Sequence, residues 1–229
     1  MRSALCIGLL SLVASTVTAD SSVGGFVLGG LSFAGFESED SSGDRLELDN
    51  GVGINLSGGI RFRPAMMVKA DFTYTDHDGG EFSQPAISFS DDVELSEFRL
   101  GFFWAPPHNS VAGIRLGGGY QNFSFEVPSS DFENDLDGLF LEAAVLLKAG
   151  DVTVFDLGGA LMGLEDDNGE DASGLELRGG VTFKAGPVDI GATLRTLMLD
   201  TDFSGGGSAE DTYTDFRITV GTTWGYPGR

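Results

Sequence analysis

The sequence predicts an all-β fold: a transmembrane antiparallel up-and-down β-barrel of ten strands. A barrel of eight strands is the alternative. Apolar residues alternate with polar residues or glycine at a period of two along most of the chain, as the two faces of a barrel strand require. Tight turns rich in proline and glycine alternate with longer acidic loops. Aromatic residues gather near both ends of the expected strands.

Residues 1–19 have the features of a secretory signal peptide. The apolar run 4–13 is too short to span a bilayer, and small residues follow it. Cleavage is expected after Ala19, which leaves residues 20–229 as one outer-membrane barrel domain. The only cysteine of the chain, Cys6, lies in this leader, so the mature protein is expected to have no disulfide, no thiol nucleophile and no cysteine-ligated metal.

The stretch 52–63 shows the alternation most clearly, because Val52 and Ile54 fall on one face and Gly53 and Asn55 on the other. The other clear strands are expected over 66–75, 97–104, 114–121 and 215–224. A soluble two-sheet sandwich would alternate in the same way. Alternation alone therefore does not decide between a membrane and water as the surroundings.

Two stretches are less regular. Residues 26–36 carry Gly29 and Gly30 in mid-run, and the apolar residues change parity there, which predicts a β-bulge. Residues 139–148 contain Glu-Ala-Ala-Val-Leu-Leu-Lys, which local propensity alone would make an amphipathic helix. A strand is favoured because most apolar residues of this segment fall on one parity and its two charged residues on the other.

Charged residues on the polar parity favour a barrel over a soluble sandwich. Ten of the thirteen lysine and arginine residues fall on that parity, where they would line a lumen. Buried bases and acids must pair, because an unpaired ion in the interior costs several kcal/mol. The predicted lumen network comprises Asp71, Glu97, Arg99, Arg115, Glu142, Asp156, Glu176, Arg178, Arg195, Asp215 and Arg217. Within it, Glu142 and Asp156 are expected to pair with Arg115 and Arg178.

The aromatic residues fall at two levels along the expected strands, as the two girdles of a membrane barrel do. Both termini are expected on the periplasmic side. The periplasmic girdle then comprises Phe62, Trp104, Phe155, Phe183, Trp224 and Tyr226. The opposite girdle comprises Phe72, Tyr74, Phe98, Tyr120 and Phe216.

The connections carry most of the negative charge. Four tight turns are expected near 63–65, 106–109, 149–151 and 185–187, and five longer loops over 37–50, 76–94, 126–137, 165–175 and 200–211. The formal net charge is −22, and loss of Arg2 with the leader lowers it by one, to −23. Nucleic acid is excluded as a partner because it requires a basic patch. Acidic loops either stay hydrated or hold divalent cations shared with lipopolysaccharide. No loop has the EF-hand spacing, so no metal site is assigned.

The leader, the rhythm of short turns and long loops and the closing strand 216–224 resemble the small outer-membrane β-barrels of Gram-negative bacteria, such as the OmpA transmembrane domain and the opacity-type and porin-like barrels. The resemblance implies a location in the cell outer membrane, contact with its lipid and lipopolysaccharide, and no cofactor. The last strand of that family usually ends the chain on an aromatic residue. Here Pro227, Gly228 and Arg229 follow Tyr226.

Two functions remain open at this point: a non-enzymatic structural or surface-interaction role in the cell envelope, and a narrow porin-like channel for small solutes or cations. About eight strands give a lumen that side chains just fill, and ten strands lie near that limit. No enzyme is expected, and no catalytic residue is assigned. An acid–histidine pair at the outer rim resembles the omptin proteases, and His77 lies between Asp76 and Asp78, but the further motifs of that family are not apparent. His108 falls in a periplasmic turn.

Overall fold

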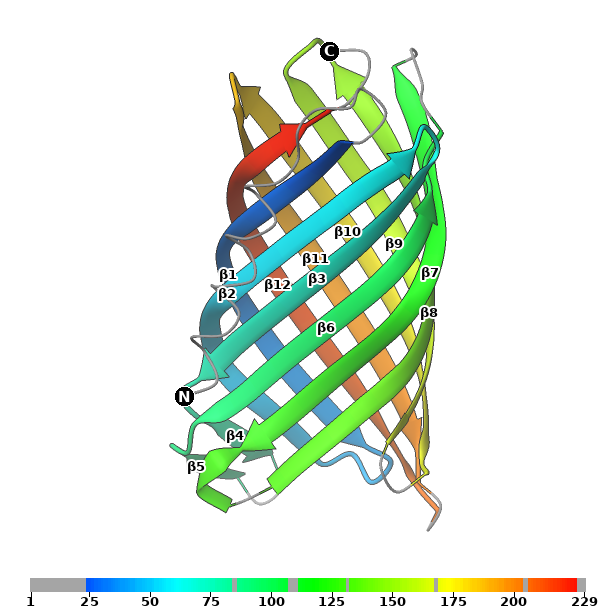
Figure 1. Cartoon of the computed structure of the whole chain (residues 1–229). Helices are drawn as coiled ribbons and strands as arrows, with labels where there is room; N and C mark the ends of the chain where they lie inside the picture. Colours follow the sequence, from blue (N-terminus) through cyan, green and yellow to red (C-terminus); the bar gives the residue numbers. More distant parts are fainter. Residues whose placement is uncertain are drawn as a thin grey trace.

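The chain forms a closed barrel of long, tilted strands (Figure 1). This computed structural model describes residues 24–83, 86–106, 111–130, 132–166, 169–203 and 206–225. The expected signal peptide, residues 1–19, lies outside the described residues, as do His108 and Tyr226. No helix in the described part of the chain is long and apolar enough to cross a membrane.

Ten antiparallel strands form the wall, and β1 pairs with both β2 and β12, which closes it. The wall strands are β1 (Gly24–Asp40), β2 (Arg45–Arg63), β3 (Met66–His77), β6 (Val93–Trp104), β7 (Ala112–Val127), β8 (Phe132–Ala149), β9 (Thr153–Asp166), β10 (Asp171–Ala185), β11 (Val188–Asp202) and β12 (Ser208–Trp224). The hairpin of β4 (Gly80–Ser83) and β5 (Ala86–Phe89) pairs with the outer part of β2. The predicted fold class and the count of ten are confirmed, and residues 139–148 are a strand.

The barrel has two different ends. The short-turn end, at the top of Figure 1, holds the connections β2–β3, β6–β7, β8–β9 and β10–β11 and both ends of the described chain. The loop end, at the bottom, holds the hairpin β4–β5 and the remaining connections. The wall strands contain 12 to 19 residues, whereas a strand that crosses a bilayer needs about 9–11. The wall is therefore taller than a membrane requires.

The strands run further toward the loop end than the sequence analysis predicts. Pairing of β1 with β2 continues to Glu39 opposite Arg45, and pairing of β7 with β8 continues to Val127 opposite Phe132. The expected loops 37–50 and 126–137 are therefore wrong over most of their length. Acidic residues suggested loops because they dominate these segments, but a strand tolerates them where its outward face meets water.

The irregularity predicted within residues 26–36 is present but does not lie at the glycine pair, because β1 keeps register with both neighbours at Gly29 and Gly30. The register against β2 shifts instead within Ala34–Phe36. The apolar residues change parity for a different reason. Phe26 and Leu28 point into the lumen, where they line a cavity, whereas Leu31 points outward and is 51% exposed.

The outward face carries a belt of apolar side chains to which every wall strand contributes. Leu141 is 71% exposed, Leu161 63% and Leu194 56%. Soluble monomers rarely expose contiguous apolar patches larger than several hundred Å². On a closed barrel such a belt matches the hydrocarbon core of a bilayer. We call it the apolar belt.

The predicted girdle residues that the structure describes all share the outward parity of their strands. Those toward the short-turn end are Phe62, Trp104, Phe155, Phe183 and Trp224, and those nearer the loop end are Phe72, Tyr74, Phe98, Tyr120 and Phe216. A Cβ added to Gly25 would meet the ring of Trp224 at 2.5 Å, so that ring lies directly over the glycine. This packing holds the indole against the wall where the described chain ends.

Beyond the apolar belt, toward the loop end, the two faces of the wall exchange character. On β6, Phe98 points outward and Glu97 inward within the belt. Closer to the loop end, Val93 and Leu95 are buried inside, and Glu94 lies on the outward parity. The same exchange occurs on β11, where Leu197 and Leu199 are buried inside. Polar residues outside and apolar residues inside are the pattern of a β-domain surrounded by water.

The apolar belt predicts a position-dependent cost for an outward charge. Leu116→Arg on β7 places a guanidinium in the belt and should cost roughly 2–4 kcal/mol of folding free energy. The matched control is Ser124→Arg, on the same strand and the same outward parity but beyond the belt, and it should cost less than about 1 kcal/mol. Reversible unfolding in denaturant from lipid vesicles measures both. Equal costs would contradict the assignment of the belt to the membrane.

Candidate functional site: the lumen

The register of the wall strands brings the charged side chains of the lumen to one level. Arg195 on β11 lies directly opposite Asp215 on β12, and Arg178 on β10 lies opposite Arg195. Two like charges in directly opposed positions are unfavourable unless a counter-charge lies between them. Glu176, two residues before Arg178 on the same face, occupies that position.

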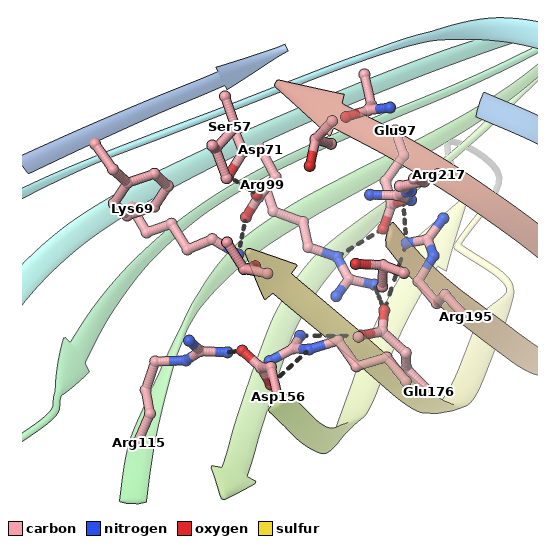
Figure 2. Close-up of a pocket in the computed structure, with 18 residues that line it drawn as sticks. Ser57, Lys69, Asp71, Glu97, Arg99, Arg115, Asp156, Glu176, Arg195 and Arg217 are labelled. Carbon is pink, nitrogen blue, oxygen red and sulfur yellow. Dashed lines mark hydrogen bonds and ion pairs between the residues drawn. The ribbon is translucent and has the colours of Figure 1, made fainter. Parts of the chain in front are cut away.

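Glu176 is the centre of the network. Its side chain is fully buried and contacts three guanidinium groups: Arg99 at 2.5 Å, Arg178 at 3.2 Å and Arg195 at 3.4 Å. Arg99 also contacts Glu97 at 2.6 Å. A carboxylate can accept about four hydrogen bonds, so one buried glutamate can serve several arginine residues. Figure 2 shows Arg99, Glu176 and Arg195 converging from different strands.

A second cluster joins the first through Arg178. The Nη1 and Nη2 atoms of Arg178 lie 2.7 and 2.5 Å from the two carboxylate oxygens of Glu142, a bidentate contact. Arg115 contacts Glu142 at 3.0 Å and Asp156 at 2.8 Å. Arg178 also approaches Asp156, at 3.8 Å. The structure thus brings together the four residues that the sequence analysis expected to pair.

The remaining members complete one continuous network. Arg195 contacts Asp215 at 2.7 Å and also Glu97, and Arg217 contacts Asp215 at 2.7 Å. The network contains five arginine and five acidic residues: Arg99, Arg115, Arg178, Arg195, Arg217, Glu97, Glu142, Asp156, Glu176 and Asp215. Its formal charge is therefore zero. We call it the ionic layer.

Asp71, the eleventh predicted network residue, pairs elsewhere. It lies directly opposite Arg99 in the register, yet its carboxylate contacts Lys69 at 2.8 Å and accepts a hydrogen bond from Ser57 at 2.6 Å. Arg99 turns toward Glu97 and Glu176. The predicted network did not include Lys69, so this pair was not assigned from the sequence.

Apolar side chains fill the lumen between the ionic layer and the loop end, which the sequence analysis missed. Each member is at most 6% exposed. This apolar layer comprises Phe36, Leu48, Val93, Leu95, Phe123, Leu136, Phe140, Met162, Leu164, Leu197, Leu199 and Tyr213. Its rings contact the ionic layer, with Arg99 5.6 Å from the ring centre of Phe140 and Arg195 5.3 Å from that of Tyr213. The signal for it was present in the sequence as a change of parity near the acidic segments.

A cavity of about 200 Å³ lies on the other side of the ionic layer, toward the short-turn end. Its floor is formed by residues of the ionic layer and by the pair of Lys69 with Asp71 (Figure 2). Hydroxyl groups of Ser57, Thr182 and Thr193 line its wall. At about 30 Å³ for each water molecule, this volume holds roughly seven. The lumen on this side of the ionic layer thus holds a cavity with a mixed lining, since Phe26 and Leu28 border it beside the polar groups. Met67 and Phe103 are also buried near the short-turn ends of β3 and β6.

His77 does not lie at the exposed outer rim, where the acid–histidine pair that resembles the omptin proteases would place it. His77 is fully buried and lies on the lumen face of β3, whereas Asp76 and Asp78 are exposed. Consecutive residues of a strand point to opposite faces, so the flanking carboxylates do not orient the ring. Its Nδ1 atom lies 2.6 Å from the backbone oxygen of Asp49 instead. No cluster of three or more metal-ligating side chains occurs among the described residues.

No family model matches the sequence, and no curated protein is significantly similar to it. Among solved structures, the outer membrane protease OmpT from Escherichia coli matches with a TM-score of 0.52 and 12% identity, over 92% of this chain and 99% of that chain. The chain has the fold of Gram-negative outer-membrane β-barrels.

Two further solved structures are less similar. The outer membrane protein OprG from Pseudomonas aeruginosa has a TM-score of 0.48 and 12% identity, over 89% of this chain and 96% of that chain. The Neisserial surface protein A (NspA) has a TM-score of 0.41 and 14% identity, over 86% and 96%. At these identities the comparison concerns the fold alone.

The geometry of Glu176 predicts a large cost for removing its charge. Glu176→Gln leaves Arg99 and Arg195 with one carboxylate fewer in a buried site and should lower the free energy of unfolding by roughly 3–5 kcal/mol. Glu37→Gln is the matched control, because Glu37 pairs with Arg45 where both side chains are more than 40% exposed, and it should cost less than about 1 kcal/mol. Chemical denaturation in lipid vesicles measures both. Similar losses for the two variants would contradict the central place of Glu176.

Proposed function

We propose that this protein is a non-enzymatic barrel of the outer membrane whose lumen is closed and whose function lies at its surface. The observation that carries this proposal is the stacking of the apolar layer on the ionic layer, which together occupy the lumen over the half of the barrel next to the loop end. A solute would have to displace both layers to pass. The apolar belt and the shared fold support the membrane location.

The loop end provides the surface for such a role. The outward face beyond the apolar belt carries many carboxylates, including Glu47, Glu94, Glu133, Asp137 and Asp171, and its only lysine or arginine among the described residues is Arg45. Lipopolysaccharide phosphates would be repelled by this wall. Divalent cations that bridge carboxylates to phosphates remove the repulsion. We therefore propose lipopolysaccharide and shared divalent cations as the partners of this face.

A narrow channel for small solutes or cations is the second candidate, and the cavity favours it. The cavity already opens part of the lumen, and the charged and hydroxyl groups in its lining suit hydrated solutes. Such a channel would require both layers to rearrange. A protease like the solved neighbour is less well supported, because His77 is buried.

Conductance in planar bilayers tests the closed lumen. The wild type should show little or no steady conductance, because an ion must cross both layers. Emptying the apolar layer by Phe123→Ala with Leu197→Ala should leave the ionic layer as a barrier. Removing one pair of opposite charges by Arg195→Ala with Glu97→Ala should leave the apolar layer as a barrier. Combining the four substitutions should produce a steady leak.

Each pair of substitutions is the control for the other, since each removes bulk at one level only. The fold of every variant is checked by its strand content in circular dichroism. A large steady conductance of the wild type would reject the closed lumen and make the channel the leading function.

The proposed partners predict a dependence on divalent cations. Calcium should raise the unfolding temperature of the protein in bilayers that contain lipopolysaccharide, and a chelator should abolish the gain, since a ligand that binds only the folded state stabilises it. Glu133→Gln, Asp135→Asn and Asp137→Asn, all on the outward parity of β8, should together reduce the gain. Asp151→Asn at the short-turn end is the control. An equal gain in phospholipid bilayers alone would contradict the proposal.

A further inference from the structure

His77 stands at a junction of the wall that no other buried titratable side chain in the described part of the chain occupies. Residues 52–63 of β2 pair with β3, whereas Leu46–Leu48 pair with β4. Asp49 lies at the point where β2 changes partner. Its N–H donates to the backbone oxygen of Gly79 at 2.9 Å, and its own carbonyl oxygen lies 2.6 Å from His77 Nδ1.

Both backbone groups of Asp49 are thus held by the segment that leads into the hairpin β4–β5. The hairpin begins at Gly80, one residue after Gly79. A Cβ on Gly51 would meet the ring of His77 at 2.6 Å, so the ring also lies flat against β2. These contacts fasten the hairpin to the mouth of the barrel, where Phe89 packs against the apolar layer.

The second ring nitrogen has no partner. Nε2 of His77 is buried and makes no hydrogen bond within the described residues. The hydrogen bond to a carbonyl requires Nδ1 to carry the proton, so Nε2 is the atom that would gain one in acid. A proton there would place an unpaired charge beside apolar side chains, which is strongly unfavourable.

We propose that His77 is an acid-sensitive clasp that holds the hairpin β4–β5 on the mouth of the barrel at neutral pH and releases it in mild acid. Release of the hairpin would open access to the apolar layer. This regulation goes beyond the proposed function, in which the barrel is permanently closed.

The surroundings of the His77 ring determine the direction in which its pKa is shifted. The charged groups of the elements packed around it lie at exposed or half-buried positions. They are the carboxylates of Glu37 on β1, Glu47 and Asp49 on β2, Asp76 on β3, Asp78, Asp91 and Asp92 in the connections, Glu81 on β4 and Glu94 on β6, together with the guanidinium of Arg45 on β2, which pairs with Glu37. Burial lowers the pKa of His77, and it outweighs the opposite influence of the Asp49 carbonyl and of Asp76, Asp49 and Asp78. His77 lies beyond the last outward residue of the apolar belt on β3, Tyr74.

The two states of the hairpin determine how the fraction of released molecules depends on pH. In the fastened state the pKa of His77 is lowered, and in the released state it returns to its ordinary value near 6.5. The released state therefore binds more protons once the pH falls below about 6.5, and the ratio of released to fastened molecules rises by up to about tenfold per unit of pH. The rise ends at the pKa of the fastened state.

A spin label on the hairpin reads out the release directly. Ser88 on β5 is exposed and uncharged, and the only natural cysteine of the chain, Cys6, lies in the leader whose removal is expected, so Ser88→Cys supplies a single site for the label. The mobile fraction of the label, measured by electron paramagnetic resonance in lipid nanodiscs from pH 8 to 4.5, should increase in acid. A label at the exposed Ser173→Cys on β10 is the control and should not respond.

Two substitutions separate the histidine from the surrounding carboxylates. His77→Asn keeps an amide donor near the position of Nδ1 but cannot be protonated, so its hairpin label should stay immobile at every pH. His77→Ala removes the hydrogen bond, and its label should be mobile at every pH. A wild type without pH response, or an Asn variant that responds like the wild type, would overturn the proposal.

A measurement on the unmodified protein guards against a variant that does not fold. The chain has only two histidines, so carbon-13 and nitrogen-15 labelling of the imidazoles resolves both. His77 should be the Nδ1–H tautomer at neutral pH, and its titration should coincide with the mobility change of the hairpin label. The opposite tautomer, or a titration separate from the mobility change, would also overturn the proposal.

Discussion

Mutual neutralisation of the charges inside the barrel is the constraint on which the rest of the structure depends. Five guanidinium groups and five carboxylates share the ionic layer, and each has lost most of its contact with water. A shift of any wall strand by one residue would turn its charged side chains toward the apolar belt. Pairing of charges across strands therefore favours one register over its neighbours, while breaking a pair leaves a buried ion whose cost is several kcal/mol.

The surroundings of the wall explain why its two halves are built differently. Inside the apolar belt, burial in lipid favours apolar residues on the outward face, and the inward face is left for polar groups that pair with one another. Beyond the belt the outward face meets water, so the hydrophobic effect again favours an apolar interior. The apolar layer is thus the core of a water-exposed β-domain built on the same strands. The length of β2, 19 residues, accommodates both halves.

Much of the fold was readable from the sequence because the period of two is a strong local signal. The parity of Val52 and Asn55 assigns one face to lipid and the other to the lumen without knowledge of distant contacts. An even number of up-and-down strands makes β1 and β12 antiparallel, so that they can pair and close the barrel. The bulge was misplaced because the parity change reflected Phe26 pointing into a cavity, which depends on residues far away in the sequence.

The contacts of the candidate site were only partly predictable for the same reason. Parity places Asp71 and Arg99 in the lumen, and the register makes them direct neighbours, yet each pairs with another side chain. The choice depends on the length and direction of side chains from several strands. The apolar layer was missed because acidic composition was read as loop. Alternation of these acids with Val93 and Leu95 carried the opposite information.

The two layers block passage by different physics, which is why both are needed for a closed lumen. Charged side chains that line a narrow passage lower the cost of bringing an ion into it, and rings of such groups occur in channels that conduct. The ionic layer still opposes ions, because its charged groups pair with one another and fill the lumen, but its polarity makes it a stronger barrier to apolar solutes. An apolar constriction excludes ions because water cannot accompany them, but it admits apolar solutes. Stacked in series, the layers oppose both classes, and a device that opens the mouth at His77 would remove support from the apolar layer first.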